Sequence, residues 1–148
     1  MRPEAASVLT VFADLINREL TATMSDSYGL QQLVRGTPLL SAIGEEFDRA
    51  ASRRVLENRA IRLLFVQAAP HISNQALASE LNNAAQGCDD DLRVTCLDQS
   101  NQSLRRLLIQ LQIWAESSDV EPAAQIRKQI WTELLLSTQR RKLSLSRF

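Results

Sequence analysis

The chain contains few residues that interrupt regular structure, with four glycines and four prolines among its 148 residues. Gly and Pro are the strongest local breaks, so a chain that is poor in both forms few turns and long elements. Leu, Ala, Gln, Arg and Glu are plentiful, and most of these residues favour helices. The sequence therefore predicts an all-α protein.

The expected architecture is an antiparallel helical bundle. Apolar residues make up 45% of the chain, and a chain of this length can bury a core within one domain. Short turn sequences at residues 25–29 and 117–122 would make the helices on either side antiparallel. We therefore expect four to six helices in a single domain over residues 1–148.

The first helix is predicted over residues 3–20, because Pro3 and Glu4 suit a first turn and apolar residues then recur at helical spacing. A short second helix is expected over residues 30–36, with Gly36 as its stop. The side chains assigned to the buried face of the first helix are Ala5, Val8, Phe12, Leu15, Ile16 and Leu20.

A longer helix is predicted over residues 38–69. Thr37 and Pro38 match an N-cap and a first turn, and Pro70 would end the helix because proline lacks the helical N–H. The segment is either one helix or two helices with a kink near Ala51–Ser52. The residues assigned to its buried face are Leu39, Leu40, Ile43, Phe47, Ala50, Ala51, Val55, Ala60, Leu63 and Leu64.

The next helix is expected over residues 74–86, with Ser73 as its N-cap and Gly87 as its stop. Residues 88–102 form the most irregular stretch. We expect a loop there that carries no more than a short turn.

The last two predicted helices are clearly amphipathic. One covers residues 103–117, with Leu104, Leu107, Leu108, Leu111 and Trp114 on one face. The other begins either with a Ser118–Glu121 capping box or with Pro122 in its first turn, and ends near Leu143. The residues assigned to its buried face are Ile126, Ile130, Trp131, Leu134 and Leu135.

No motif points to catalysis or to a cofactor. Cys88, Cys96 and the single His71 do not supply the four closely spaced ligands of a structural zinc site. Asp89–Asp91 lacks the alternating ligands of an EF-hand loop, so a solvated acidic loop is expected. Phosphate-binding loops, nucleophile elbows and Cys–His dyads are not recognisable. We expect a protein that needs no cofactor and is not an enzyme on its own.

Charge and hydropathy limit the kinds of partner that this chain is expected to bind. The 17 basic and 17 acidic residues balance, which disfavours nucleic-acid binding. The N-terminus shows no signal peptide, and no run approaches the ~20 apolar residues that cross a bilayer. We expect a cytoplasmic chain with reduced cysteines, no membrane contact, and either a protein partner or a homo-oligomer.

Arginines cluster within residues 53–62, RRVLENRAIR. On a helix, Arg59 and Arg62 share a face, and Arg54 lies about one and a half turns before them. The cluster is either a solvated face paired with Glu57 or a surface that binds an anion or a protein partner.

The chain ends in a second basic stretch, STQRRKLSLSRF. Arg141 and Lys142 would fall in the last turn of a helix, where cations favour the negative end of the dipole. Leu143, Leu145 and Phe148 then alternate loosely with polar residues, so we expect this segment to pack against the bundle or a partner. Across both basic stretches, the candidate partner-binding residues are Arg54, Arg59, Arg62, Arg141, Lys142, Leu143 and Leu145.

Both ends of the chain resemble a family of small helical proteins encoded beside aminoglycoside-phosphotransferase-like kinases and acyl-CoA dehydrogenases. The start matches through Arg2, Pro3 and Ala5, followed by an amphipathic helix. The end matches through a Leu-rich helix, a turn and a last helix, although Ser146-Arg147 replaces the family's usual Asn-Pro. Residues 21–101 match poorly. The closing segment is matched by Arg141, Lys142, Leu143 and Leu145.

The resemblance implies an accessory subunit for a kinase that phosphorylates a hydroxyacyl-CoA, as in the breakdown of levulinate-type hydroxy acids. The kinase would supply ATP, magnesium and catalysis, and no catalytic residue is carried over to this chain. Two alternatives remain open. One is a self-associating helical adaptor, favoured by the leucines of residues 107–114, and the other is a weak binder of anionic surfaces or nucleic acid through the arginines.

Overall fold

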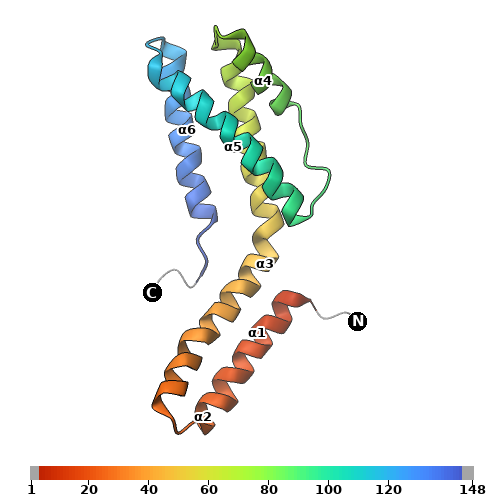
Figure 1. Cartoon of the computed structure of the whole chain (residues 1–148), viewed down its shortest axis with the longest axis vertical. Helices are drawn as coiled ribbons and strands as arrows, with labels where there is room; N and C mark the ends of the chain where they lie inside the picture. The colour runs from red at the N-terminus through yellow and green to blue at the C-terminus, as the bar shows by residue number, and fades with distance from the viewer. Residues whose placement is uncertain (1–3, 145–148) are drawn as a thin grey trace. The chain divides into compact units, whose positions relative to one another are not determined.

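The computed structural model describes residues 4–144, and this part of the chain is all-α, without a strand. The predicted fold class is therefore confirmed. The described residues group into an N-terminal unit, residues 4–50 with 142–144, and a core unit, residues 51–141. The elements shown in Figure 1 are α1 (Ala5–Leu15), a π-helical turn (Ile16–Leu20), α2 (Thr21–Thr23), α3 (Ser27–Ala68), a 3₁₀ turn (Ala69–His71), α4 (Gln75–Ala85), α5 (Val94–Ser117) and α6 (Glu121–Arg140).

Helix α3 is one continuous element, so the predicted break at Gly36–Pro38 is wrong, as is the N-cap role of Thr37. Thr37 is 3% exposed, and its hydroxyl donates to the carbonyl oxygen of Leu33, 2.7 Å away. Pro38 lies inside the helix. Local propensity there favours a break, but tertiary packing of Thr37 outweighs it. The alternative of a helix divided near residues 51–52 is likewise not adopted.

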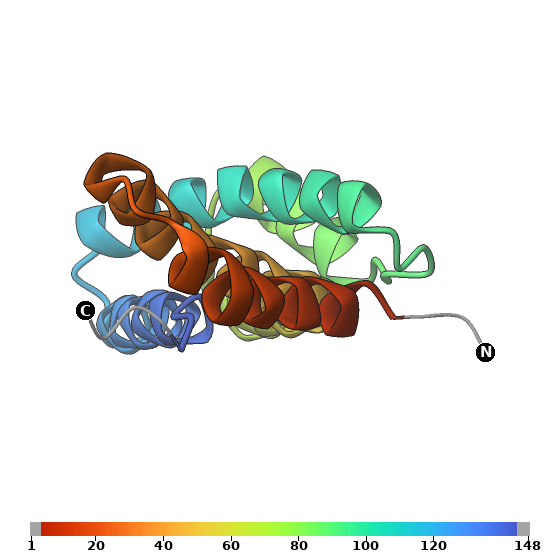
Figure 2. The ribbon, with the colours of Figure 1, turned by 90° about the horizontal axis from the view of Figure 1, so that it is seen from below.

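In the N-terminal unit, α1 lies antiparallel beside the first half of α3 (Figure 1 and Figure 2). Their contact uses small residues: Ala13 is 1% exposed, and a Cβ built on Gly44 would lie 3.3 Å from the carbonyl oxygen of Ala6. The predicted buried stripes of this unit are mostly wrong. Large apolar residues assigned to them that are instead exposed are Val8, Phe12, Leu15, Leu20, Leu39, Ile43 and Phe47.

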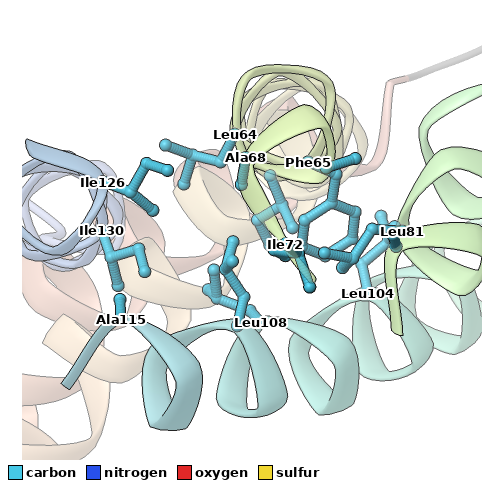
Figure 3. Packing of buried hydrophobic residues seen from close by; sticks show 14 residues of the cluster. Leu64, Phe65, Ala68, Ile72, Leu81, Leu104, Leu108, Ala115, Ile126 and Ile130 are labelled. Carbon is cyan, nitrogen blue, oxygen red and sulfur yellow. The ribbon is translucent and has the colours of Figure 1, made fainter. Parts of the chain in front are cut away.

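In the core unit, the second half of α3 packs with α4, α5 and α6 around one apolar cluster (Figure 3). Phe65, Leu81, Leu111 and Ile130 have no exposed surface. The predicted face of α5 is largely confirmed, since Leu104, Leu108 and Leu111 are buried while Leu107 and Trp114 pack partly buried against them. The other buried members are Ile61, Leu64, Ala68, Ala69, Ile72, Ala78, Ala115 and Ile126.

Several predicted helix boundaries shift. The N-cap of α4 is Asn74, not Ser73, because the Asn74 Oδ1 accepts from the backbone N–H groups of Ala76 and Leu77 at 3.1 and 3.3 Å. Helix α4 ends at Ala85 before it reaches Gly87, with no glycine among residues 4–144 at positive φ.

The predicted loop over residues 88–102 is wrong in its second half, because α5 already begins at Val94. Leu97 and Asn101 are buried on its first turns, so core packing extends the helix toward its N-terminus. Helix α6 starts after Val120 with Pro122 in its first turn and no side-chain cap, and it ends at Arg140, short of Leu143.

The buried face of α6 also differs from the prediction. Trp131 and Leu135 are 57% and 61% exposed, whereas Glu133 and Ser137 are buried. The buried face of α6 therefore begins with Ile126 and Ile130 and continues with the polar Glu133 and Ser137. Both polar side chains have hydrogen-bond partners, which makes their burial tolerable.

Candidate interaction surfaces

The predicted arginines Arg54 and Arg62 are held in ion pairs inside the core unit. Arg54 pairs with Asp98, with 3.1 Å between Nη2 and Oδ2. Arg62 binds Asp89 through both terminal nitrogens at 2.9 Å, and the Arg62 and Asp89 side chains are 13% and 7% exposed. This bidentate geometry fits an arginine–carboxylate pair that positions structure. It joins α3 to the loop that precedes α5.

Asp89 is fixed from three sides. Besides Arg62, the Asn58 amide donates to its Oδ1 at 3.1 Å and the Ser100 hydroxyl at 3.2 Å. The hydrogen bonds from Arg62 lower the pKa of Asp89, against the opposing effect of burial, and Asn58 adds to the lowering. The carboxylate is therefore an anchor for the loop, and part of the expected solvated acidic loop is instead buried.

Glu57 is a second buried anchor, 2% exposed. Arg141 reaches it from the end of α6, with Nη2 at 3.0 Å from both carboxylate oxygens. The Ser137 hydroxyl donates to Oε1, and the Asn101 amide donates to Oε2 at 3.3 Å. Burial disfavours the charged form of Glu57, but the hydrogen bonds from Arg141 and Ser137 outweigh it and lower the pKa. The charge of Arg141 thus faces an internal acid.

Arg59 lies on the exposed side of α3, apart from the Glu57 cluster. It lines a shallow hollow of about 360 Å³ together with Arg62. Val55, Leu63 and Val66 contribute apolar surface to the same hollow. The structure therefore brings Arg59 and Arg62 together, as expected, but Arg62 is already bound to Asp89.

The described end of the chain folds back within the N-terminal unit. The Arg49 Nη1 donates to the carbonyl oxygen of Lys142 at 3.1 Å, and the Ser144 N–H and hydroxyl donate to Glu45 at 2.8 and 2.6 Å. These Ser144 hydrogen bonds lower the pKa of Glu45. Leu143 is half-buried, while Leu145 and Phe148 lie outside the described residues. Glu45 also pairs with Arg49, one turn further along α3.

A groove that the sequence did not suggest runs between α3 and α6 in the core unit. Its volume is about 510 Å³. Leu64 forms part of its apolar floor, and Leu63 and Leu136, which are 53% and 41% exposed, form its walls. Figure 3 shows Leu64 and Ile126 meeting between the two helices. We call this hollow the α3/α6 groove.

The α3/α6 groove continues past Gln67, Gln125 and Gln129 into a second hollow of about 380 Å³. His71 and Pro122 line this far end. The lining residues on this side run from Ala60 in α3 to His71 in the 3₁₀ turn, so the groove has the length of a short helix. Three glutamines, Lys128 and Thr132 make up most of its polar edge.

Comparison with protein-family models, with curated proteins and with solved structures finds no match to this chain. Within residues 4–144, no helix is long and apolar enough to cross a membrane. The same residues contain no group of three or more His, Cys, Asp or Glu side chains placed to hold a metal ion.

Sequence reasoning missed both the α3/α6 groove and the buried polar anchors. The groove walls were missed because Leu63 was assigned to the same buried stripe as Leu64. A signal was present, because apolar residues that flank a buried stripe on both sides indicate a helix with a second apolar face. The anchors Glu57 and Asp89 gave no signal of their own, because charged residues are rarely buried unless they are paired.

Proposed function

We propose that this chain is a non-catalytic interaction subunit that binds an amphipathic helix of a partner protein in the α3/α6 groove. The observation that carries the proposal is the apolar wall formed by Leu63 and Leu136, both well exposed beside a buried floor. Binding of an apolar helix face in a groove between two helices is a common mode of peptide recognition.

The size of the groove supports a helix of about three turns. The lining residues of α3 run from Ala60 to Gln67, and the adjoining hollow reaches His71, a rise of roughly 17 Å at 1.5 Å per residue. A helix of this length presents two or three apolar anchors at three- and four-residue spacing. Its anchors would enter between Leu63 and Leu136.

The edge of the groove suggests the chemistry of the partner. Lys128 lies on this edge, while the nearby acid Glu133 is buried and paired with Arg140, with 3.1 Å between Arg140 Nη2 and Glu133 Oε2. The pairing with Glu133 raises the pKa of Arg140. A partner helix that carries an acidic residue beside its apolar anchors would complement Lys128.

The first partner to test is a kinase of the aminoglycoside-phosphotransferase-like class, because both ends of the chain resemble proteins encoded beside such kinases. The alternative of a polyanion binder is less well supported. Arg54, Arg62 and Arg141 each have a carboxylate partner in the core unit, and breaking such pairs would oppose binding to phosphates.

Titration calorimetry with an aminoglycoside-phosphotransferase-like kinase, followed by kinase assays with and without the chain, tests the proposal. Leu63→Glu and Leu136→Glu should each weaken binding by roughly 30-fold, as expected for the loss of a hot-spot contact. Ile109→Glu is the matched control, because Ile109 is 57% exposed on α5 and lies outside the groove. Full kinase activity without the chain, or binding that both groove variants leave intact, would overturn the proposal.

A further inference from the structure

Six of the exposed large apolar side chains on α1 and on the first half of α3 form one set. Their exposed fractions range from 42% for Leu15 to 63% for Leu39. None of them belongs to the α3/α6 groove. We call this set the hairpin face; its members are Val8, Phe12 and Leu15 of α1 and Leu39, Ile43 and Phe47 of α3.

Small residues, together with Leu9, lie where the two helices approach most closely. Ala6 and Ala13 are seven residues apart on α1, and Thr37 and Gly44 are seven residues apart on α3. Seven residues are close to two full turns, so each pair lies on one line along its helix. The carbonyl oxygen of Ala6 lies 3.3 Å from where a Gly44 Cβ would stand. This close approach leaves the large apolar side chains beside the contact.

All six residues lie on one side of the hairpin. Phe12 immediately precedes the contact residue Ala13, and Ile43 immediately precedes Gly44, so each lies about 100° around its helix in the same rotational sense. Because α1 and α3 are antiparallel, equal rotations in the same sense lead to the same side of the pair. Val8 and Leu15 extend the line on α1, and the remaining members extend it on α3.

The opposite side carries acidic residues beside the exposed Val34 and is partly occupied. The residues that follow the contact positions are Asp14 and Glu45, which the same geometry places on that opposite side. Glu45 accepts hydrogen bonds from Ser144, so Ser144 lies on the polar side. The hairpin is therefore amphipathic, and its apolar side is available for packing against a further layer of helices.

The hairpin face is large for a surface that stays in water. Six side chains of this size, each about half exposed, leave roughly 600 Å² of apolar surface, at the upper end of the ~300–600 Å² of the largest patch on a typical monomer. Each partner in an interface of standard size contributes about 800 Å². The face therefore has nearly the area that a stable dimer needs.

We propose that a second copy of this chain covers the hairpin face, so that two hairpins form an antiparallel four-helix bundle across a two-fold axis. This inference rests on a surface outside the α3/α6 groove and does not depend on the proposed partner.

Three properties of the face favour a second copy over a different protein. Its six members are all apolar, and a two-fold axis brings the same apolar face of each copy together. The net charge of the chain is zero, so two copies do not repel each other at long range. Residues 5–23 and 27–47 are each roughly 30 Å long as helices, and hairpins with equal arms pair into four-helix bundles.

Sedimentation velocity of the full chain over a wide concentration range tests the proposal. The wild-type protein should sediment as a dimer. Phe12→Glu and Ile43→Glu should each raise the dimer dissociation constant by roughly 30-fold or more, because each buries a charge in the interface. Thr10→Glu and Gln31→Glu are matched controls on the same two helices, at exposed positions on the polar side, and should leave the dimer unchanged.

A second measurement covers the case in which a face variant loses its fold. Amide hydrogen exchange of the wild-type chain, read at low and high protein concentration, should show residues 5–23 and 27–47 gaining protection as the dimer forms. A monomer at every concentration, concentration-independent exchange in these segments, or a dimer that folded Phe12→Glu and Ile43→Glu variants retain would each overturn the proposal. Kinase binding by the monomeric face variants would leave the groove proposal standing by itself.

Discussion

Replacing Glu57 with Gln is the sharpest test of the buried polar anchors. Oε1 accepts from Ser137 and Arg141, and Oε2 accepts from Arg141 and Asn101. Glu57→Gln keeps the side-chain volume but puts an NH₂ group in place of one oxygen. The new amide donor would face three existing donors at the position of Oε1 or two at that of Oε2, so two or three hydrogen bonds are lost.

The size of the effect follows from these contacts. Hydrogen bonds to charged groups contribute about 1.5–3 kcal/mol each to stability, and a buried unsatisfied donor costs about 1–3 kcal/mol. The Arg141 side chain is 46% exposed and can turn to water, which removes part of the loss. We expect Glu57→Gln to lower the free energy of unfolding by about 2 kcal/mol at pH 7, and Tm by about 6 °C.

The effect should depend on pH. The folded-state pKa of Glu57 lies below its ordinary value of 4.5, so its ionised form stabilises the folded chain above that value. That contribution is lost as the pH falls through the folded pKa. The difference in unfolding free energy between wild type and Glu57→Gln should therefore be full at pH 7 and shrink below about pH 4.5.

Urea unfolding followed by circular dichroism at several pH values measures this difference. Glu80→Gln, at an exposed position on α4, is the matched control and should change stability by less than about 0.5 kcal/mol. A double-mutant cycle with Arg141→Met should give a coupling of about 1 kcal/mol. Equal stability of Glu57→Gln and wild type at pH 7, or a difference that stays constant with pH, would refute the reasoning.

Three further predictions follow from local contacts. Gly44→Val should destabilise the N-terminal unit by about 2 kcal/mol, because even a bare Cβ there lies 3.3 Å from a backbone oxygen of α1; loss of helical signal on urea titration would measure it. Asn74→Ala should cost about 1 kcal/mol in the same assay and Ser73→Ala almost nothing, since only Asn74 caps α4. Asp89→Asn should cost about 3 kcal/mol at pH 7 by weakening its pair with Arg62. Because the pKa of Asp89 is lowered, that loss should shrink as the pH falls through its folded-state value.

Much of the fold was predictable because helix periodicity dominates this chain. The scarcity of Gly and Pro correctly indicated long helices, and the spacing of Leu104, Leu108 and Leu111 correctly indicated the core side of α5. Pro70 also ended a helix as expected, with α3 closing at Ala68. These signals are local, so the sequence alone carries them.

What could not be predicted depends on contacts between distant residues. The burial of Ser137 depends on Glu57, which lies 80 positions earlier, so periodicity favoured the apolar Leu135 in its place. Apolar spacing likewise cannot distinguish a stripe that packs within the chain from one that stays exposed, which is why Phe12 and Ile43 were assigned to a core. The predicted partner-binding arginines raise the same problem, because a carboxylate from another element can occupy them.

The continuity of α3 through Gly36 and Pro38 has a consequence for how the chain folds. Before any tertiary contact forms, local preferences would start the helix at Pro38 and leave residues 27–36 non-helical. We therefore expect that segment to become helical when α1 docks and to belong to a separate cooperative unit with a lower free energy of opening. In native-state hydrogen exchange, residues 27–36 should open together with α1, while residues 53–68 of the same helix open only on global unfolding.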